Sequence, residues 1–308
     1  MRYLIAVLFS GIGMLLHAQN IPSFNTAQFQ VMGARALGPS TMSGRITAIE
    51  GVYADAQLNL YVGTAGGGIW KSQNGGQSFA PIFDKYNQSI GALAVEPGNA
   101  RVVYAGTGES NMRNSVSIGE GLYKTTDGGS NWQKLGLDST EHISKIVLDP
   151  ADKKVLYVSA PGPLFKASKH RGLYKSIDAG KTWEKILYIN ENTGCSDIAI
   201  HPTKSNILFA STWEFRRKPF SFVSGGAGSA LYKSNDGGKS WNKITKGLPE
   251  GNLGRIVIAV NPSKPSQVLA IVEAKESGLY QSNDEGETWT KLTSATGLTA
   301  RPFYFSTL

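Results

Sequence analysis

The segment Tyr232-Lys-Ser-Asn-Asp-Gly-Gly-Lys-Ser-Trp241 recurs four more times, with small changes, in this chain of 308 residues. The other copies begin at Trp70, Tyr123, Tyr174 and Tyr280. A period of about 50 residues, without an apolar stripe at helical spacing, is typical of β-propeller blades and not of helical repeats. The sequence therefore predicts an all-β chain built from similar four-stranded sheets.

We term these five segments the acidic turns, although the first carries Asn74 where the others carry Asp127, Asp178, Asp236 and Asp284. A side chain of this kind accepts N–H groups of its own turn, and the glycines that follow supply positive φ. Each copy closes on an aromatic residue that is expected to pack back onto its hairpin: Phe79, Trp132, Trp183, Trp241 and Trp289. Because its own turn explains each Asp, we interpret these residues as structural and not as a catalytic pair.

Each acidic turn is expected to join the third and fourth strands of a sheet, with two strands upstream. The predicted blades are residues 44–83, 90–136, 143–187, 195–245 and 254–293, and residues 301–308 have the pattern of a sixth innermost strand. A propeller must close to protect its strand edges, so five blades and a stub predict an incomplete, truncated propeller. The alternative is a closed five-blade ring in which residues 24–32 supply the closing strand.

The first 18 residues have the pattern of a signal peptide. Arg2 gives a positive start, an apolar run covers residues 4–16, and Ala18 precedes the expected cleavage point. The run is shorter than the roughly 20 residues that cross a bilayer as a helix, so a retained anchor is the less favoured alternative. We expect a secreted or periplasmic protein without a membrane span, with an N-terminal segment at 19–43 and the propeller at 44–308.

Charge and cysteine content argue against several functional classes. The net charge is +8, but the lysines are scattered along the chain and form no basic tract of the kind that binds nucleic acid. Cys195 is the single cysteine, so no intrachain disulfide can form, and its apolar surroundings indicate a buried side chain. The four histidines show no metal-ligand spacing. We expect neither a metal nor a cofactor.

The turns match the Asp-box (BNR) motif, which sialidases, sortilin-like receptors and xyloglucanase-type glycoside hydrolases share. More specific stretches are Leu37-Gly-Pro-Ser-Thr-Met-Ser-Gly-Arg-Ile46, Gly63-Thr-Ala-Gly-Gly-Gly-Ile-Trp-Lys71, Gly106-Thr-Gly-Glu109 and Trp213-Glu-Phe-Arg-Arg-Lys-Pro-Phe-Ser-Phe-Val-Ser-Gly-Gly226. From residue 34 onward the chain resembles large bacterial proteins with a sortilin-like propeller that carry a glycosyl-hydrolase label. The resemblance implies a longer parent protein with further blades or a second propeller.

A ligand site is expected at the propeller mouth, where the connections 108–120 and 213–229 are long and 161–171 is intermediate. Glu109 and Glu214 follow matching strands of the second and fourth blades, and Glu273 follows the matching strand of the fifth. Glu109 and Glu214 are the candidate acid and base of a glycosidase. The candidate ligand-binding side chains are Glu273 with Arg113, Arg216 and Arg217 for polar groups, and Trp213, Phe220 and Phe222 for stacking on a sugar ring.

Two functions stay open at this point. The chain binds a polysaccharide or an exported polypeptide at its mouth, as part of a glycoside hydrolase, or it is a sortilin-like protein-binding or scaffold module without catalytic activity. A purely structural interpretation also exists for the site residues, in which Glu109 and Glu214 pair with neighbouring arginines and Trp213 caps the core.

Overall fold

The structure is a computed structural model that describes residues 44–304, 307 and 308. The chain divides into two compact units, Met1–Leu37 and Gly38–Leu308, and every described residue belongs to the second unit. The predicted signal peptide at 1–18 and the N-terminal segment at 19–43, with its alternative closing strand at 24–32, lie outside the described residues.

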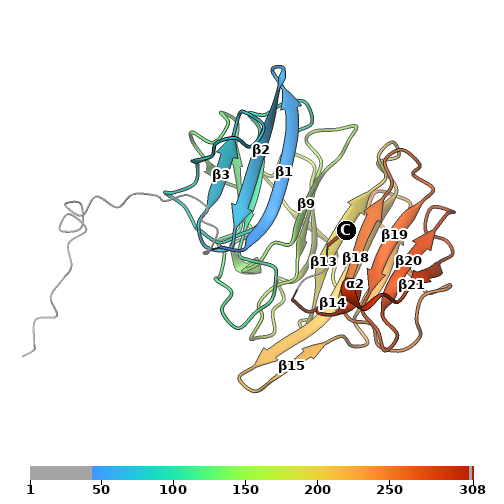
Figure 1. Cartoon of the computed structure of the whole chain (residues 1–308). Coiled ribbons are helices and arrows are strands. Elements are labelled where there is room, and N and C mark those ends of the chain that lie inside the picture. The colour runs from blue at the N-terminus through green and yellow to red at the C-terminus, as the bar shows by residue number, and fades with distance from the viewer. Residues whose placement is uncertain (1–43, 305–306) are drawn as a thin grey trace, which may run out of the picture. The chain divides into compact units, whose positions relative to one another are not determined.

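Five antiparallel sheets follow one another along the described chain (Figure 1). The first sheet contains β1 (Ile46–Ala54), β2 (Gln57–Thr64), β3 (Ile69–Ser72) and β4 (Ala80–Pro81). The second contains β5 (Ile90–Val95), β6 (Val103–Thr107), β7 (Leu122–Thr125) and β8 (Gln133–Lys134). The third contains β9 (Lys145–Leu148), β10 (Leu156–Ala160), β11 (Gly172–Ser176) and β12 (Glu184–Leu187).

The fourth sheet contains β13 (Thr193–Ile200), β14 (Leu208–Lys218), β16 (Ala230–Ser234) and β17 (Asn242–Ile244). A further strand, β15 (Ser221–Ser224), pairs with the long β14 and extends it as a hairpin (Figure 1). The fifth sheet contains β18 (Ile256–Val260), β19 (Val268–Val272), β20 (Gly278–Ser282) and β21 (Thr290–Thr293). Two short helical turns complete the described elements, η1 (Asp138–Thr140) and α2 (Thr296–Thr299).

The first strands of successive sheets lie beside one another. Strand β1 contacts β5, β5 contacts β9, β9 contacts β13, and β13 contacts β18. A separate hydrophobic core fills the space between each neighbouring pair of sheets. Cys195 is fully buried in the core between the third and fourth sheets, as its sequence context predicts. Four-stranded sheets packed face to face through their first strands form a β-propeller, so the fold class predicted from the repeats is confirmed.

The acidic turns contain the hydrogen bonds expected from their sequence. Asp178 shows the pattern: its Oδ1 accepts the backbone N–H of Thr182 at 2.9 Å and the hydroxyl of Ser176 at 2.8 Å. Its Oδ2 accepts the hydroxyl of Thr182 at 2.6 Å, and the Ser176 oxygen in turn accepts the N–H of Gly180 at 2.8 Å. Hydrogen bonds from Thr182 and Ser176 to the charged carboxylate lower the pKa of Asp178 to about 2.

The first turn makes a similar network with an uncharged side chain. Asn74 Oδ1 accepts the N–H of Ser78 at 3.0 Å and the hydroxyl of Ser72 at 2.8 Å, while its Nδ2 donates to Ser78 Oγ at 2.9 Å. The amide therefore replaces the carboxylate without loss of the turn, and the first sheet alone presents a neutral turn of this kind.

Two of the tryptophans that close the turns bond to the preceding sheet, whereas Trp289 Nε1 donates to Gly286 O of its own turn at 3.0 Å, as expected. Trp132 Nε1 donates to Ile82 O of the preceding sheet at 2.9 Å, and Trp183 Nε1 donates to Leu135 O at 2.8 Å. The Trp132 ring also meets Phe83 edge to face, with centroids 4.9 Å apart. Trp132 and Trp183 therefore link neighbouring blades through their indole N–H groups.

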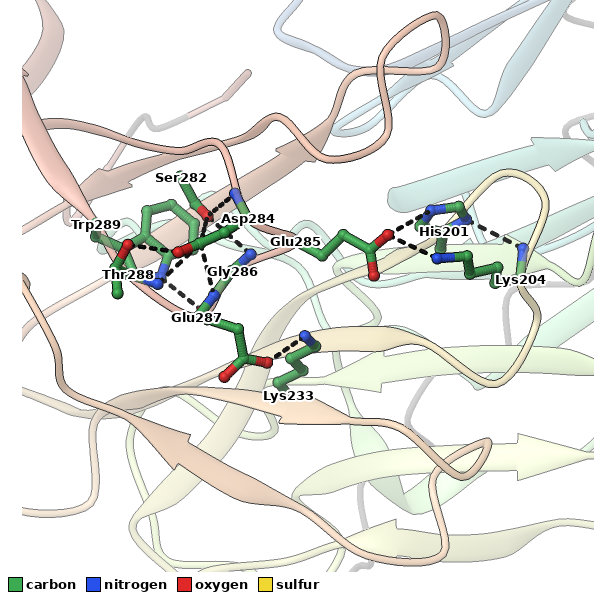
Figure 2. Close-up of polar contacts among 10 residues, drawn as sticks. All are labelled: His201, Lys204, Lys233, Ser282, Asp284, Glu285, Gly286, Glu287, Thr288 and Trp289. Atoms are coloured by element: carbon green, nitrogen blue, oxygen red, sulfur yellow. Dashed lines mark hydrogen bonds and ion pairs between the residues drawn. The ribbon is translucent and has the colours of Figure 1, made fainter.

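Lysines on the third strands also join neighbouring sheets through the acidic turns. Lys71 Nζ donates to Gly128 O at 3.1 Å, and Lys175 Nζ donates to Gly237 O at 2.8 Å. Figure 2 shows the equivalent contact at the last turn, where Lys233 Nζ lies 2.6 Å from Glu287 Oε1. Lys204, in the connection between β13 and β14, lies 2.6 Å from Glu285 Oε1 of the same turn. These turns therefore bond neighbouring blades to each other, in addition to connecting the third and fourth strands of their own blade.

The segment expected to begin a sixth strand, 301–308, carries no strand where the structure describes it. Residues 301–304 form a turn in which the N–H of Tyr304 donates to Arg301 O at 3.0 Å. Phe303 is 3% exposed because it packs against Trp213 and Phe222, and this anchoring holds the segment in a turn. Among the described residues, no helix has the length and apolar character needed to cross a membrane.

Candidate functional site

The long connections meet in one aromatic cluster. Met112 from 108–120, Leu164 from 161–171, Trp213 and Phe215 from β14, and Phe303 pack together and are almost fully buried. The Trp213 ring is 1% exposed, stacks on Phe215 at 4.2 Å and meets Phe303 edge to face at 5.3 Å. The structure brings these three connections together, but Trp213 offers no free face to a sugar and is part of the core.

Arg171 holds the connection 161–171 in place. Its guanidinium is fully buried, donates to Pro161 O at 2.5 Å and to Pro163 O, and lies 4.5 Å from the Phe215 ring centroid. Burial lowers the pKa of Arg171 to about 9, with a smaller contribution from the charge of Arg216. Sequence reasoning could not single out this residue, because a buried Arg bound to its own loop has no recognisable spacing.

Glu109 is committed to an ion pair. Its carboxylate is completely buried and accepts Arg45 Nε at 2.7 Å and Arg45 Nη2 at 2.5 Å. Arg45 precedes β1, so the pair joins the first and second sheets. A carboxylate held on both oxygens by a guanidinium is a poor proton donor or acceptor for a substrate. The structure therefore favours the structural interpretation of Glu109.

Glu214 has different partners, although it follows the equivalent strand. Its Oε2 accepts the N–H of Gly228 at 3.0 Å, and its own N–H donates to Ser229 Oγ at 2.9 Å. A Cβ on Gly226 would lie 2.4 Å from the Glu214 carboxyl carbon, so this glycine lets the loop close over the carboxylate. Glu214 thus supports its own connection, and the structure gives it no shared role with Glu109.

The other polar candidate residues also serve mainly to hold loops. Glu273 Oε2 accepts Ser224 Oγ at 2.6 Å and the N–H of Arg255 at 2.7 Å. Arg216 Nη2 donates to Asn192 Oδ1 at 2.5 Å, and Arg217 Nη1 donates to Tyr304 Oη at 3.1 Å. Arg113 lies half-buried between β6 and β7.

Phe220 and Phe222 are the exposed aromatic residues of the predicted set. Phe220 is 92% exposed at the tip of the β14–β15 hairpin, and Phe222 is 51% exposed on β15. Phe222 lies 4.9 Å from the Phe303 ring and 5.3 Å from the Arg217 guanidinium. Aromatic surface of this kind beside cationic groups can bind flat or partly apolar ligands.

A cavity of about 190 Å³ lies where the first strands of the sheets converge. We term it the axial cavity. Its charged lining residues are Glu50 from β1, Lys145 from β9, Asp197 from β13 and Arg255, which precedes β18. Hydroxyl and amide groups of Thr47, Ser110, Asn111, Ser144 and Ser196 add to the lining. Four sheets and the connection 108–120 thus contribute polar groups to one space.

Asp197 is the most buried acid of the axial cavity. It is 6% exposed, and its carboxylate accepts the N–H groups of Ile198 at 2.9 Å and Ile258 at 2.8 Å. Burial raises the pKa of Asp197, and the positive charges of Lys145 and Arg255 oppose that rise. Burial likewise raises the pKa of Glu50, which the charge of Lys145 opposes. Lys145 therefore acts on both acids.

Arg255 supplies an unsatisfied donor. The residue is one of those that line the cavity and is 6% exposed, and its buried Nη1 has no hydrogen-bond partner among the described residues. Its guanidinium lies 5.4 Å from the Trp213 ring centroid, and burial lowers its pKa against the charges of Asp197 and Glu273. Buried polar groups are normally hydrogen-bonded, so a free donor beside a cavity marks a place for an acceptor.

The sequence did not point to the axial cavity. Asp197 and Lys145 occupy matching positions of two first strands, because their partners Ser211 and Ser159 hold equivalent places in β14 and β10. The feature of the sequence that could have indicated the cavity is a charged residue at the same position of two first strands, Lys145 in one and Asp197 in the other. No cluster of metal-binding side chains occurs in the part of the chain that the structure describes.

Comparison with known proteins agrees with the fold. Residues 67–212 match the Sortilin-Vps10 family, described as sortilin, neurotensin receptor 3. The chain is 28% identical over 218 residues to a xyloglucanase of Paenibacillus sp, covering 63% of this chain and 20% of that protein. It is 24% identical over 262 residues to an oligoxyloglucan-reducing end-specific xyloglucanase of Emericella nidulans, covering 72% and 30%.

Two solved structures have similar folds. An ancestral GH74 enzyme superposes with a TM-score of 0.60 and 22% identity, covering 80% of this chain and 33% of that one. The GH74 enzyme of Niastella koreensis gives 0.55 and 22% identity, with coverages of 75% and 36%. The chain thus spans about a fifth to a third of the lengths of these relatives.

Proposed function

We propose that this chain, a sortilin-like β-propeller related to xyloglucanase-type propellers, binds a neutral, hydroxyl-rich polysaccharide at its axial cavity. The observation that carries the proposal is the free Nη1 donor of Arg255, which lines the same cavity as Asp197 and Glu50. A sugar hydroxyl both donates and accepts, so neighbouring hydroxyls can satisfy a guanidinium and a carboxylate together.

The charges of the cavity favour a neutral ligand over an ion. Lys145 and Arg255 are balanced by Glu50 and Asp197, and Glu273 adds a further acid next to Arg255. A free anion would meet the carboxylates of Glu50 and Asp197, and a free cation would meet two basic groups. The volume of about 190 Å³ equals roughly six water molecules, which suits one sugar unit of a chain.

The relatives support the choice of polysaccharide. Those compared above are named as xyloglucanases, so xyloglucan is the first ligand to test. The exposed Phe220 and Phe222 on the β14–β15 hairpin offer additional stacking surface for units of the chain outside the cavity. Export by the predicted signal peptide at 1–18 belongs to the same proposal, since such polysaccharides lie outside the cell.

The proposal for this chain covers binding of the polysaccharide and does not include its cleavage. Hydrolysis of a glycosidic bond needs two carboxyl groups that can reach the bond or its attacking water. Glu109 is held by Arg45, Glu214 by its own loop, and Asp197 by two backbone N–H groups. The proposed activity of the chain is therefore recognition, and glycoside hydrolysis is a proposal for the whole parent protein only.

Calorimetric titration with xyloglucan oligosaccharides tests the proposal. Glu50→Gln and Lys145→Met remove charged partners of a hydroxyl but keep the side-chain shape, so each should weaken binding about tenfold or more. Lys239→Met, on the exposed turn of the fourth sheet, is the matched control and should bind normally. Equal affinities for all four proteins would contradict the axial site. Binding of exported peptides but not of oligosaccharides would favour the sortilin-like alternative.

A further inference from the structure

A second, larger groove lies between the first and second sheets, at their acidic turns. Lys71 of β3 reaches the turn of the second sheet, so the face that carries Lys71 is turned toward that sheet. Ala80 pairs with Lys71 across the strands and therefore lies on the same face. Both residues line a groove of about 660 Å³, whose other wall is the second turn with Asp127 and Ser130. We term it the rim groove.

The equivalent groove between the fourth and fifth sheets is much smaller, at about 220 Å³. Asn242 holds the position of Ala80 there, because it pairs with Lys233 across the strands. Glu287 holds the position of Ser130, three residues after the Asp of its turn. Glu287 Oε1 lies 2.6 Å from Lys233 Nζ, so an ion pair spans this groove (Figure 2).

The two middle interfaces also carry longer side chains at both positions. Gln133 and Lys181 hold them between the second and third sheets, and Glu184 and Lys239 hold them between the third and fourth. The first interface alone combines an alanine on the strand with a serine on the turn. These two small residues leave the rim groove open at positions where the other repeats place longer, mostly charged side chains.

The rim groove presents apolar surface beside neutral polar groups. Phe79, Pro81 and Ile82 line it and are each half-buried. Gln73 lines it as well and is exposed. The Ser130 hydroxyl donates to a backbone oxygen of its own turn at 3.5 Å, which is the upper limit for a hydrogen bond, so it remains available to a ligand. An amide and a hydroxyl can each donate and accept.

The two charged groups of the rim groove already have partners. The Lys71 ammonium donates to Gly128 O at 3.1 Å, and Asp127 Oδ1 accepts the N–H of Asn131 at 2.9 Å. One positive and one negative charge give the groove no preference for an ion of either sign. An aromatic ring next to neutral donors and acceptors matches a sugar ring, which has apolar C–H faces and hydroxyl groups around its edge.

We propose that the rim groove is a second binding site, for a neutral saccharide whose ring stacks on Phe79 and whose hydroxyl groups bond to Gln73 and Ser130. Among the described residues, none lines both this groove and the axial cavity. The rim site therefore goes beyond the proposed function and does not depend on binding at the axial cavity.

Nuclear magnetic resonance tests the two sites separately. On addition of a xyloglucan oligosaccharide to the 15N-labelled chain, the amide resonances of Gly75 and Gly128 should shift, since both glycines belong to the turns that border the rim groove. The amides of Ile198 and Ile258, which donate to Asp197, report on the axial cavity in the same spectra.

Substitutions taken from a neighbouring interface close the rim groove. Ala80→Gln with Ser130→Lys copies the side chains at the next interface, so the double variant should fold and should weaken the binding reported by Gly75 and Gly128 about tenfold or more. Thr290→Gln changes the equivalent strand position of the fifth sheet and is the matched control, with binding like that of the wild type. Gln73→Ala removes an exposed side chain and should weaken the same binding about threefold.

The pattern of shifts decides between the sites. Shifts at Ile198 and Ile258 without shifts at Gly75 and Gly128 would overturn the rim site and leave the axial site standing. The reverse pattern would support the rim site and contradict the axial one. Unchanged affinity in a folded double variant, checked by thermal melting, would also overturn the rim site, as would the absence of any shift in the wild type.

Discussion

Arg45, before the first strand of the first sheet, and Glu109, two residues after the second strand of the next sheet, form a bidentate ion pair. Arg45 Nε and Nη2 lie 2.7 Å and 2.5 Å from the two oxygens of a carboxylate that has no exposed surface. The Glu109 carboxylate, which the sequence presents as a candidate acid or base, thus links two blades through this ion pair.

Removal of the arginine should destabilise the fold and leave ligand binding unchanged. Arg45→Met leaves the buried Glu109 carboxylate without a hydrogen-bond donor, which should lower the free energy of unfolding by about 1–3 kcal/mol. The double variant Arg45→Met/Glu109→Leu should recover part of the loss, because no buried charge is left unpaired. Urea unfolding of the three proteins measures this. A single variant as stable as the wild type would show that the pair contributes nothing.

Two aromatic residues of the same connection should behave in opposite ways. Trp213 is 1% exposed, so Trp213→Ala should cost about 3–5 kcal/mol of stability through the lost contacts and the cavity left behind. Phe220 is 92% exposed, so Phe220→Ala should change stability by less than about 0.5 kcal/mol. Thermal melting of both variants checks the contrast. Similar melting temperatures for the two would show that the connection is not packed as described.

The acidic turns should make stability depend on pH below about 4. Hydrogen bonds lower the pKa of Asp178 to about 2, below its value in the unfolded chain, so the unfolded state binds more protons in between. The stabilisation is present above the unfolded pKa and is lost as the pH falls through the folded pKa. Asp178→Asn copies the first turn, with its Asn74, and cannot be protonated in this way.

Urea midpoints measured from about pH 5 down to about pH 2.5 test this prediction. The wild-type midpoint should fall more steeply than that of Asp178→Asn, so the difference between the two proteins should shrink as the pH decreases. The two chains share every other titratable group, so the difference reports on Asp178. Parallel curves over this range would mean that the turn network does not depend on the charge.

Most of the fold could be predicted from the sequence repeats. Short strands, paired glycines and a fixed aromatic recur in the sequence because each blade solves the same local problem, so five sheets could be predicted without a structure. The hydrogen-bond partners of Trp132 and Trp183 could not be predicted in this way. Trp132 and Trp183 bond to carbonyls of the preceding sheet, and which carbonyls lie there depends on how the blades pack.

The candidate site was harder to predict for the same reason. Glu109 and Glu214 stood out because they follow matching strands. Their carboxylates nevertheless have different partners, since Glu109 accepts from the side chain of Arg45 and Glu214 accepts from the backbone N–H of Gly228. Asp197 lies within β13 and Lys145 begins β9, and the sequence alone does not mark them as a site, since only convergence of the first strands brings them to one cavity. Charged residues at equivalent positions of neighbouring repeats are the sequence feature that could indicate such a cavity.

A crystal of the chain soaked with a xyloglucan oligosaccharide tests the central claim most directly. The account predicts electron density for a sugar unit in the axial cavity, with hydroxyl groups within hydrogen-bond distance of Arg255 Nη1 and of the Asp197 or Glu50 carboxylate. Density confined to the β14–β15 hairpin around Phe220 and Phe222, with an empty axial cavity, would contradict it.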